Sequence, residues 1–303
     1  MIRHSYLETL ARNKNTPERR AQLIADVFGP VGDIEHPRQL HLGSTFCRQQ
    51  HLSLPEFTWW IRKTGEEPTL HRKQWEYFYV GQSLWDEGML KPGRRGLVFG
   101  VGQEPLPSLF ASFGCEILAT DQAETAAQNQ GWVATREHSS SCTRLNERGL
   151  CDPALFAHNV RFRAVDMNAI PEDLGEQFDF CWSTCCFEHL GSLEHGMRFV
   201  EASLATLRPG GVAVHTTEFN FTSNIFTAES SGLSLYRRRD IERLARRLKE
   251  RGFDVAPLDF SAAGGLADRL VDLPPYKDNI HLRLRILGYD CTSFGLLIRK
   301  PAP

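Results

Sequence analysis

Two glycines and a distant aspartate form the first pattern in the sequence that could bind a ligand. Gly100 and Gly102 follow a short apolar segment, and Asp121 ends a second one, 19 residues beyond Gly102. Glycine has no Cβ, so the backbone of such a turn can approach a ligand closely. A carboxylate in the second position can accept two hydrogen bonds from a ribose diol. The spacing is typical of nucleoside-binding folds, with an ordinary tight turn and a helix N-cap as the alternatives.

Acidic and imidazole side chains follow the next apolar segments. Asp166 closes a third segment, where it could accept a hydrogen bond from an adenine amino group with Met167 against the ring; a plain turn is the alternative. The run Ser183 to Leu190 follows a fourth segment and contains Glu188 and His189. His189 is the natural general base, because imidazole titrates near neutral pH, and Glu188 could orient it or bind substrate. A purely structural histidine is the other interpretation.

A second acid–base pair follows the fifth apolar segment. His215 and Glu218 lie three residues apart there. They are only two possible metal ligands, whereas a catalytic metal usually takes three from the protein. We therefore expect no metal site from the sequence.

The elements that must position these residues alternate between strand and helix. Strands are expected at 96–99, 116–120, 160–165, 178–183, 212–217, 255–260 and 293–299, with helices at 105–113, 193–207 and 236–251. This order predicts an α/β fold, a mostly parallel sheet with helices on both faces and a ligand at the carboxyl ends of its strands.

Two regions flank or interrupt this pattern. Residues 1–92 carry no strong strand alternation and are rich in aromatic residues, so we expect a helical cap whose aromatics pack in the core or form one wall of a substrate pocket. The connection 261–292 contains Pro274-Pro275 and is too long for a plain hairpin. Long ordered loops often carry function, so we expect it to lie over the active site.

Composition narrows the class of partner. The chain has 303 residues, 41% of them hydrophobic, and a net charge of −2, which argues against broad electrostatic binding to nucleic acid or to an anionic membrane. No apolar run is long enough for a transmembrane helix. The polar N-terminus has no apolar signal core, so a cytoplasmic protein is expected, with its eight scattered cysteines as reduced thiols.

From about residue 94 to residue 299 the chain resembles the class I S-adenosylmethionine-dependent methyltransferases. The segments that carry the resemblance are LVFGVGQEP, ILATDQ, VDMNAIP, FDFCWSTCCFEHL, LRPGGVAVHTTEF and SFGLLIRK. The resemblance implies a Rossmann-like, seven-stranded sheet whose last strand is antiparallel. It divides the chain into a helical N-terminal extension, 1–92, and a methyltransferase domain, 93–303.

The resemblance also implies roles for individual residues. Gly100 and Gly102 would pass close to the methionine part of S-adenosylmethionine, and Asp121 would bind the ribose hydroxyls. Asp166 and Met167 would hold the adenine ring, and the loop from Ser183 to His189 would line the methyl-transfer site.

Two positions depart from the family pattern. Val98 stands where the family usually has an acidic residue, and Glu104 stands where it usually has a third glycine. Glu104 could repel the methionine carboxylate of the cofactor or contact its amino or sulfonium cation.

The expected activity is methyl transfer from S-adenosylmethionine to an oxygen of a small molecule or a glycan. The TTEFNFTSN segment is similar to methyltransferases of bacterial surface-glycan synthesis. His189 is the expected base, with His215 second and Glu218 as a helper. The alternatives are a non-catalytic S-adenosylmethionine-binding scaffold and an NAD-dependent oxidoreductase, whose GxGxxG fingerprint has Pro105 in place of its third glycine.

Overall fold

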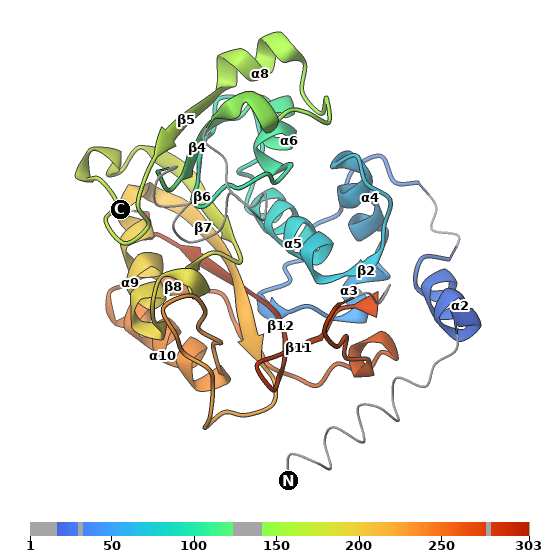
Figure 1. Cartoon of the computed structure of the whole chain (residues 1–303). Helices are drawn as coiled ribbons and strands as arrows, with labels where there is room; N and C mark the ends of the chain where they lie inside the picture. Colours follow the sequence, from blue (N-terminus) through green and yellow to red (C-terminus); the bar gives the residue numbers. More distant parts are fainter. Residues whose placement is uncertain (1–16, 30–32, 124–140, 277–279, 303) are drawn as a thin grey trace.

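One large sheet runs through the molecule and carries helices on both faces (Figure 1). The computed structural model describes residues 17–29, 33–123, 141–276 and 280–302. The central strands lie in the order β5-β4-β3-β6-β7-β12. Their bounds are β3 (Arg95–Val98), β4 (Glu116–Asp121), β5 (Val160–Ala164), β6 (Phe178–Thr184), β7 (Leu207–Asn220) and β12 (Tyr289–Arg299). The first five are parallel and β12 is antiparallel to β7, which confirms the expected fold class.

Helices cover the two faces of the sheet as separate layers. One face is covered by α4 (Pro55–Lys63), α5 (Arg72–Asp86), α6 (Leu106–Ser112) and α8 (Pro153–Asn159), and the other by α9 (Leu193–Ser203) and α10 (Arg238–Glu250). In β6, Phe180 and Trp182 pack in the first layer and Cys181 packs in the second. Because both faces are covered, every residue of this strand is buried, and its middle, Phe180 to Trp182, is continuously apolar.

The N-terminal region contributes a strand that the sequence did not predict. It is helical in α2 (Pro17–Val27), α3 (Gln49–Leu52), α4 and α5, but β1 (Ser44–Phe46) pairs with β12 in the main sheet. With only three residues, β1 leaves no alternation in the sequence to detect.

This added strand also divides the strand expected at 255–260. The segment forms β8 (Asp254–Val255), which pairs with β12, and β9 (Leu258–Asp259), which pairs with β1 because β1 occupies that part of the edge of β12. Together with β11 (Leu284–Ile286), a hairpin partner of β12, these changes give ten strands in the described sheet instead of seven.

The connection 261–292 packs against the N-terminal region. It contains η5 (Ala267–Arg269) and β10 (Ile280–His281), which pairs with β2 (Leu70–His71) in a small second sheet. The remaining short helices are η1 (Cys142–Arg144), η2 (Glu172–Leu174), η3 (Phe187–His189) and η4 (Leu204–Thr206). All eight cysteines are free thiols. Within the described ranges, no helix has the length and apolar character needed to cross a membrane.

Candidate active site

A cleft of about 740 Å³ lies at the carboxyl ends of β3, β4, β5 and β6. This is where a ligand is expected in an open α/β sheet. Six of the seven residues predicted to bind a cofactor line it: Gly100, Gly102, Glu104, Asp121, Asp166 and Met167. Thr184 lines the cleft in place of the predicted Ser183, which is fully buried. The described lining contains no residue of the connection 261–292, which we expected over the site.

The turn after β3 has the backbone conformation for which its glycines were singled out. Gly100 and Gly102 have φ values of +61° and +50°, in the left-handed region that side chains with a Cβ disfavour. A Cβ on Gly100 would lie 2.8 Å from the Cys186 sulfur, so a side chain at this position would have to displace Cys186. The Gly102 amide donates a hydrogen bond of 3.0 Å to Oδ2 of Asp121, which links the ends of β3 and β4.

Glu104 is buried against the floor of the cleft. Its carboxylate accepts hydrogen bonds from the Trp182 indole at 2.6 Å and from the Thr184 hydroxyl at 2.5 Å. Burial raises the pKa of Glu104 to about 7, against the lowering effect of those two donors. The carboxyl group therefore changes charge near neutral pH, and it does so inside the cleft.

The two candidate histidines occupy different environments. His189, at the end of η3, lines the cleft, and its Nδ1 lies 2.6 Å from the Gly232 carbonyl oxygen. Since a carbonyl only accepts, Nδ1 carries a proton and Nε2 is the basic atom of the neutral ring.

The structure does not bring His215 to the cleft. It is fully buried in β7, with one ring nitrogen 2.8 Å from the Ser183 hydroxyl and the other 3.1 Å from that of Ser203. Burial lowers its pKa to about 3, so it stays neutral.

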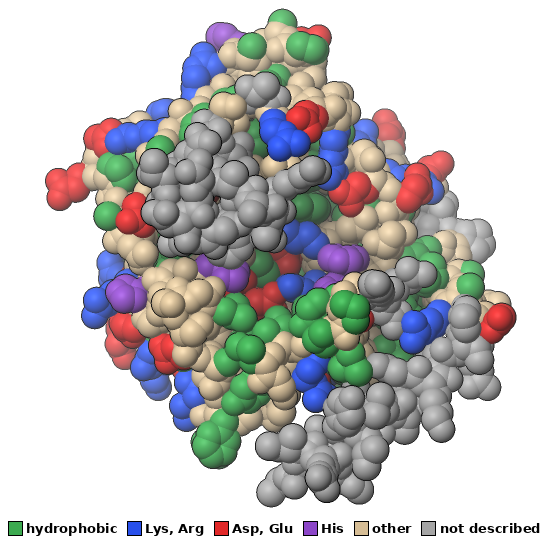
Figure 2. Space-filling model, in the orientation of Figure 1, with side chains coloured by type: hydrophobic (Ala, Val, Ile, Leu, Met, Phe, Trp, Pro, Cys, Tyr) green, Lys and Arg blue, Asp and Glu red, His purple; other side chains and the backbone are tan. Residues whose placement is uncertain are grey.

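A buried charged cluster adjoins the cleft, and the sequence did not indicate it. Glu76 of α5 is fully buried and pairs with Lys73 at 3.0 Å and with Arg72 at 3.4 Å. Arg72 also pairs with Glu218, at the end of β7. Figure 2 shows acidic and basic side chains together in a hollow of this face, with histidines at its rim. The RKxxE spacing at the start of α5 was the available signal, but charges four apart on a helix usually face solvent.

Two further groups of this cluster have unusual environments. Burial, together with the nearby Glu188 and Glu76, raises the pKa of Glu218 to about 7, although Arg72 acts in the opposite direction. Cys185, next to β6, lines the cleft with its backbone at φ +48°, a conformation that strains a residue other than glycine. Its thiol donates to Glu76 at 3.1 Å, and burial raises the pKa of that thiol well above its usual value.

The comparisons with known proteins find similarity among solved structures and not among sequences. No protein-family model and no curated protein sequence matches the chain. The parallel strands β3 to β7 and the antiparallel last strand β12 match the mostly parallel sheet with an antiparallel last strand that the sequence resemblance implied.

Several solved structures are similar to this chain, all at low sequence identity. A Galdieria sulphuraria protein assigned as a sarcosine dimethylglycine methyltransferase is 14% identical, covering 82% of this chain and 99% of its own, with a TM-score of 0.45. A methyltransferase from Aquifex aeolicus is 15% identical, covering 73% and 88%, with a TM-score of 0.39. The [4+2]-cyclase SpnF is 18% identical, covering 83% and 93%, with a TM-score of 0.46. Such likeness concerns the arrangement of the chain, not the reaction.

Proposed function

We propose that this chain transfers a methyl group from S-adenosylmethionine to an oxygen of a small molecule or a glycan. The observation that carries the proposal is the cleft, where a glycine turn in the left-handed backbone conformation lies beside Asp121 and Asp166 from neighbouring strand ends. S-adenosylmethionine would supply an activated methyl group on a sulfonium, which is already a good leaving group. The protein then has to bind, position and deprotonate the acceptor.

The residues of the cleft fit the parts of such a cofactor. Asp121 would accept hydrogen bonds from the ribose diol, and Met167 would pack against the adenine with Asp166 beside it. The buried carboxyl of Glu104 fits the cationic end of the molecule better than its carboxylate, because a nearby positive charge favours ionisation of a group whose pKa is about 7. The departure at Glu104 from the family pattern is therefore compatible with the cofactor.

His189 is the proposed base for a neutral hydroxyl acceptor. Its basic Nε2 belongs to a ring fixed by the Gly232 carbonyl at the wall of the cleft. Glu218 would assist from the adjoining cluster, where it pairs with Arg72. His215 is not proposed for this step, since both of its nitrogens face serine hydroxyls in the core.

The first experiment is calorimetric titration with S-adenosylmethionine, S-adenosylhomocysteine and NAD. We expect the first two to bind and Asp121→Asn to weaken them about tenfold or more, because a hydrogen bond to a charged group contributes about 1.5–3 kcal/mol. Asp254→Asn is the matched control, an exposed aspartate outside the cleft. Binding of NAD instead, or equal affinity in both variants, would overturn the cofactor assignment.

Catalysis needs a second measurement. His189→Gln should lower kcat on a hydroxylated acceptor while leaving the affinity for S-adenosylmethionine unchanged. Cofactor binding without turnover on any acceptor would favour the non-catalytic binding protein instead.

A further inference from the structure

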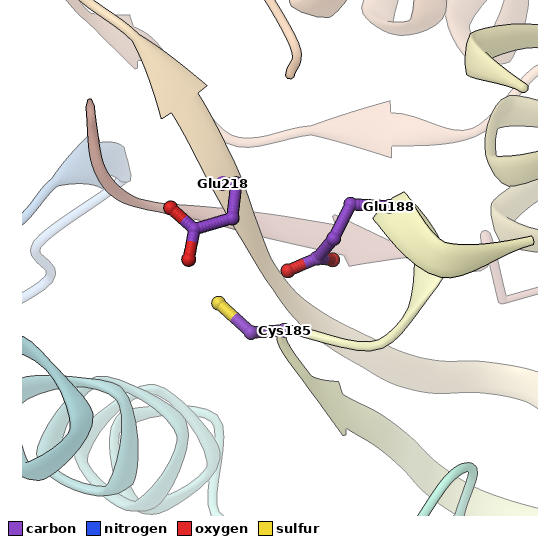
Figure 3. Close-up of side chains that lie close together, drawn as sticks. All are labelled: Cys185, Glu188 and Glu218. Carbon is purple, nitrogen blue, oxygen red and sulfur yellow. The ribbon is translucent and has the colours of Figure 1, made fainter. Parts of the chain in front are cut away.

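Three potential metal ligands converge beside the cleft. Cys185 adjoins the end of β6, Glu188 lies in η3 and Glu218 lies near the end of β7. One ligand atom from each residue lies within 4.8 Å of the other two. Figure 3 shows the thiol and the two carboxylates pointing toward a common space between the three chain segments.

Each carboxylate has one oxygen in use and one oxygen unused. Glu188 is fully buried, and its Oε2 accepts a hydrogen bond from the Thr217 hydroxyl at 3.1 Å. Glu218 is 4% exposed, and its Oε1 pairs with Arg72. Within the described part of the chain, Glu188 Oε1 and Glu218 Oε2 are buried and have no hydrogen-bond partner. A buried carboxylate oxygen without a hydrogen-bond partner lowers the stability of the folded state. Two such oxygens in one cluster therefore indicate a ligand that binds between them.

The charge of the surroundings indicates that this ligand is a cation. Three carboxylates, those of Glu76, Glu188 and Glu218, share two cations, Arg72 and Lys73. Both cations contact Glu76, and only Arg72 reaches Glu218. Among the described residues, Glu188 has no cation within ion-pair distance. When all three carboxylates are ionised, one negative charge therefore remains uncompensated in a buried site.

We propose that Cys185 Sγ, Glu188 Oε1 and Glu218 Oε2 bind a divalent transition-metal ion of the Zn²⁺ type. A thiolate ligand favours such an ion over Mg²⁺ or Ca²⁺, which prefer oxygen alone. On binding, the thiol proton leaves to solvent, since a thiol that coordinates a metal ion is deprotonated. The ion brings two positive charges and the thiolate one negative charge, so together they balance the one carboxylate charge that Arg72 and Lys73 leave uncompensated.

The three ligands would leave one coordination position of the metal ion open. Three protein ligands leave a fourth position on a tetrahedral ion for water or substrate. Cys185 also lines the cleft, so the ion would lie at the wall of the space proposed for methyl transfer. The metal proposal does not depend on the proposed methyl transfer, because metal binding is measured without turnover.

The test uses the full chain, freed of metal by dialysis against a chelator and then titrated with Co²⁺ alone. We expect one Co²⁺ per chain with a sulfur-to-cobalt charge-transfer band in the near ultraviolet, and displacement of Co²⁺ by Zn²⁺ but not by Mg²⁺. Cys185→Ser should abolish the band. Cys186→Ser is the matched control, because that neighbouring thiol points at the Gly100 carbonyl at 3.3 Å, and the band should persist.

A carboxylate variant keeps the proposal testable if Cys185→Ser does not fold. Loss of a residue that only contacts a metal ligand weakens metal binding by roughly 10–100-fold. Glu188→Gln removes a ligand itself, so it should weaken Co²⁺ binding by more than that. The thermal unfolding of the metal-free protein serves as the folding check for each variant. Absence of stoichiometric Co²⁺ binding, an unchanged band in Cys185→Ser, or unchanged affinity in Glu188→Gln would overturn the proposal.

Discussion

Replacing Glu104 by glutamine should make the stability of the protein less sensitive to pH. The carboxyl of Glu104 is buried and its pKa is about 7, against the usual 4.5. In the folded state the group holds its proton at pH values where the unfolded chain has lost it. Its contribution to stability is therefore fully present below about pH 4.5 and is lost as the pH rises through about 7.

The size of this effect follows from the two pKa values. At about 1.36 kcal/mol per pH unit, the difference between 4.5 and about 7 corresponds to about 3 kcal/mol. Glutamine cannot ionise and is nearly isosteric. Its oxygen can accept from the Trp182 indole, and the Thr184 hydroxyl can rotate to accept from its amide. Glu104→Gln should thus match the wild type near pH 4.5 and exceed its unfolding free energy by about 3 kcal/mol above pH 8.

Urea unfolding of both proteins across that pH range measures the difference directly, because all other titrating groups are common to both. Glu250→Gln, at an exposed glutamate of α10, is the matched control for the loss of one carboxyl group. A constant loss of stability in Glu104→Gln at every pH would refute the reasoning. It would mean that the carboxylate stays ionised and that its two hydrogen bonds outweigh the cost of burial.

Three further predictions concern the site and the core beneath it. Arg72→Met should lower the unfolding free energy by about 3–5 kcal/mol, because it leaves Glu218 buried without its cation. Urea unfolding measures this loss, and a value below about 1 kcal/mol would contradict the buried ion pair. Gly100→Ala should lower the unfolding free energy by about 1–2 kcal/mol, because alanine disfavours the left-handed backbone conformation of this position. It should also weaken the binding of S-adenosylmethionine measured by calorimetry, because Cys186 must move. Unchanged affinity would place the cofactor elsewhere. His215→Ala should lower stability by about 1–3 kcal/mol with kcat per folded molecule preserved, and a fall in kcat at unchanged stability would restore its catalytic role.

The sheet and the strand ends that line the cleft could be predicted because their signals are local. Strand β6, expected at 178–183, spans Phe178–Thr184, and α10, expected at 236–251, spans Arg238–Glu250. In both, apolar spacing is imposed by packing against covered faces, so the period survives in the sequence. The positions of the turn at Gly100 and of Asp121 could be predicted for the same reason. The turn comes shortly after the buried strand β3, and Asp121 is the last residue of the buried strand β4.

The charged cluster could not be predicted because it is assembled from distant parts of the chain. Arg72 reaches Glu218 across the interface between the N-terminal region and the sheet, and nothing local to either residue marks the pairing. The prediction that His215 lies in the site was wrong for a related reason. Its position near a strand end suggested a site, whereas the side chain turns into the core toward Ser183 and Ser203. Strand ends could be assigned from the sequence, but the direction of each side chain could not.

The pairing of β1 with β12 bears on how the chain can be made. Thr45 lies opposite Gly295, so β1 is synthesised long before the strand with which it pairs. Until then, the edge of the sheet formed by β7 has no partner, and the apolar faces of α4 and α5 lack part of their cover. Contacts of such long range slow folding, and unpaired edges invite aggregation. Completion of the sheet therefore requires a late closure step in which β12 joins β7 and β1, and a fragment that stops before residue 289 lacks the strand on which that closure depends.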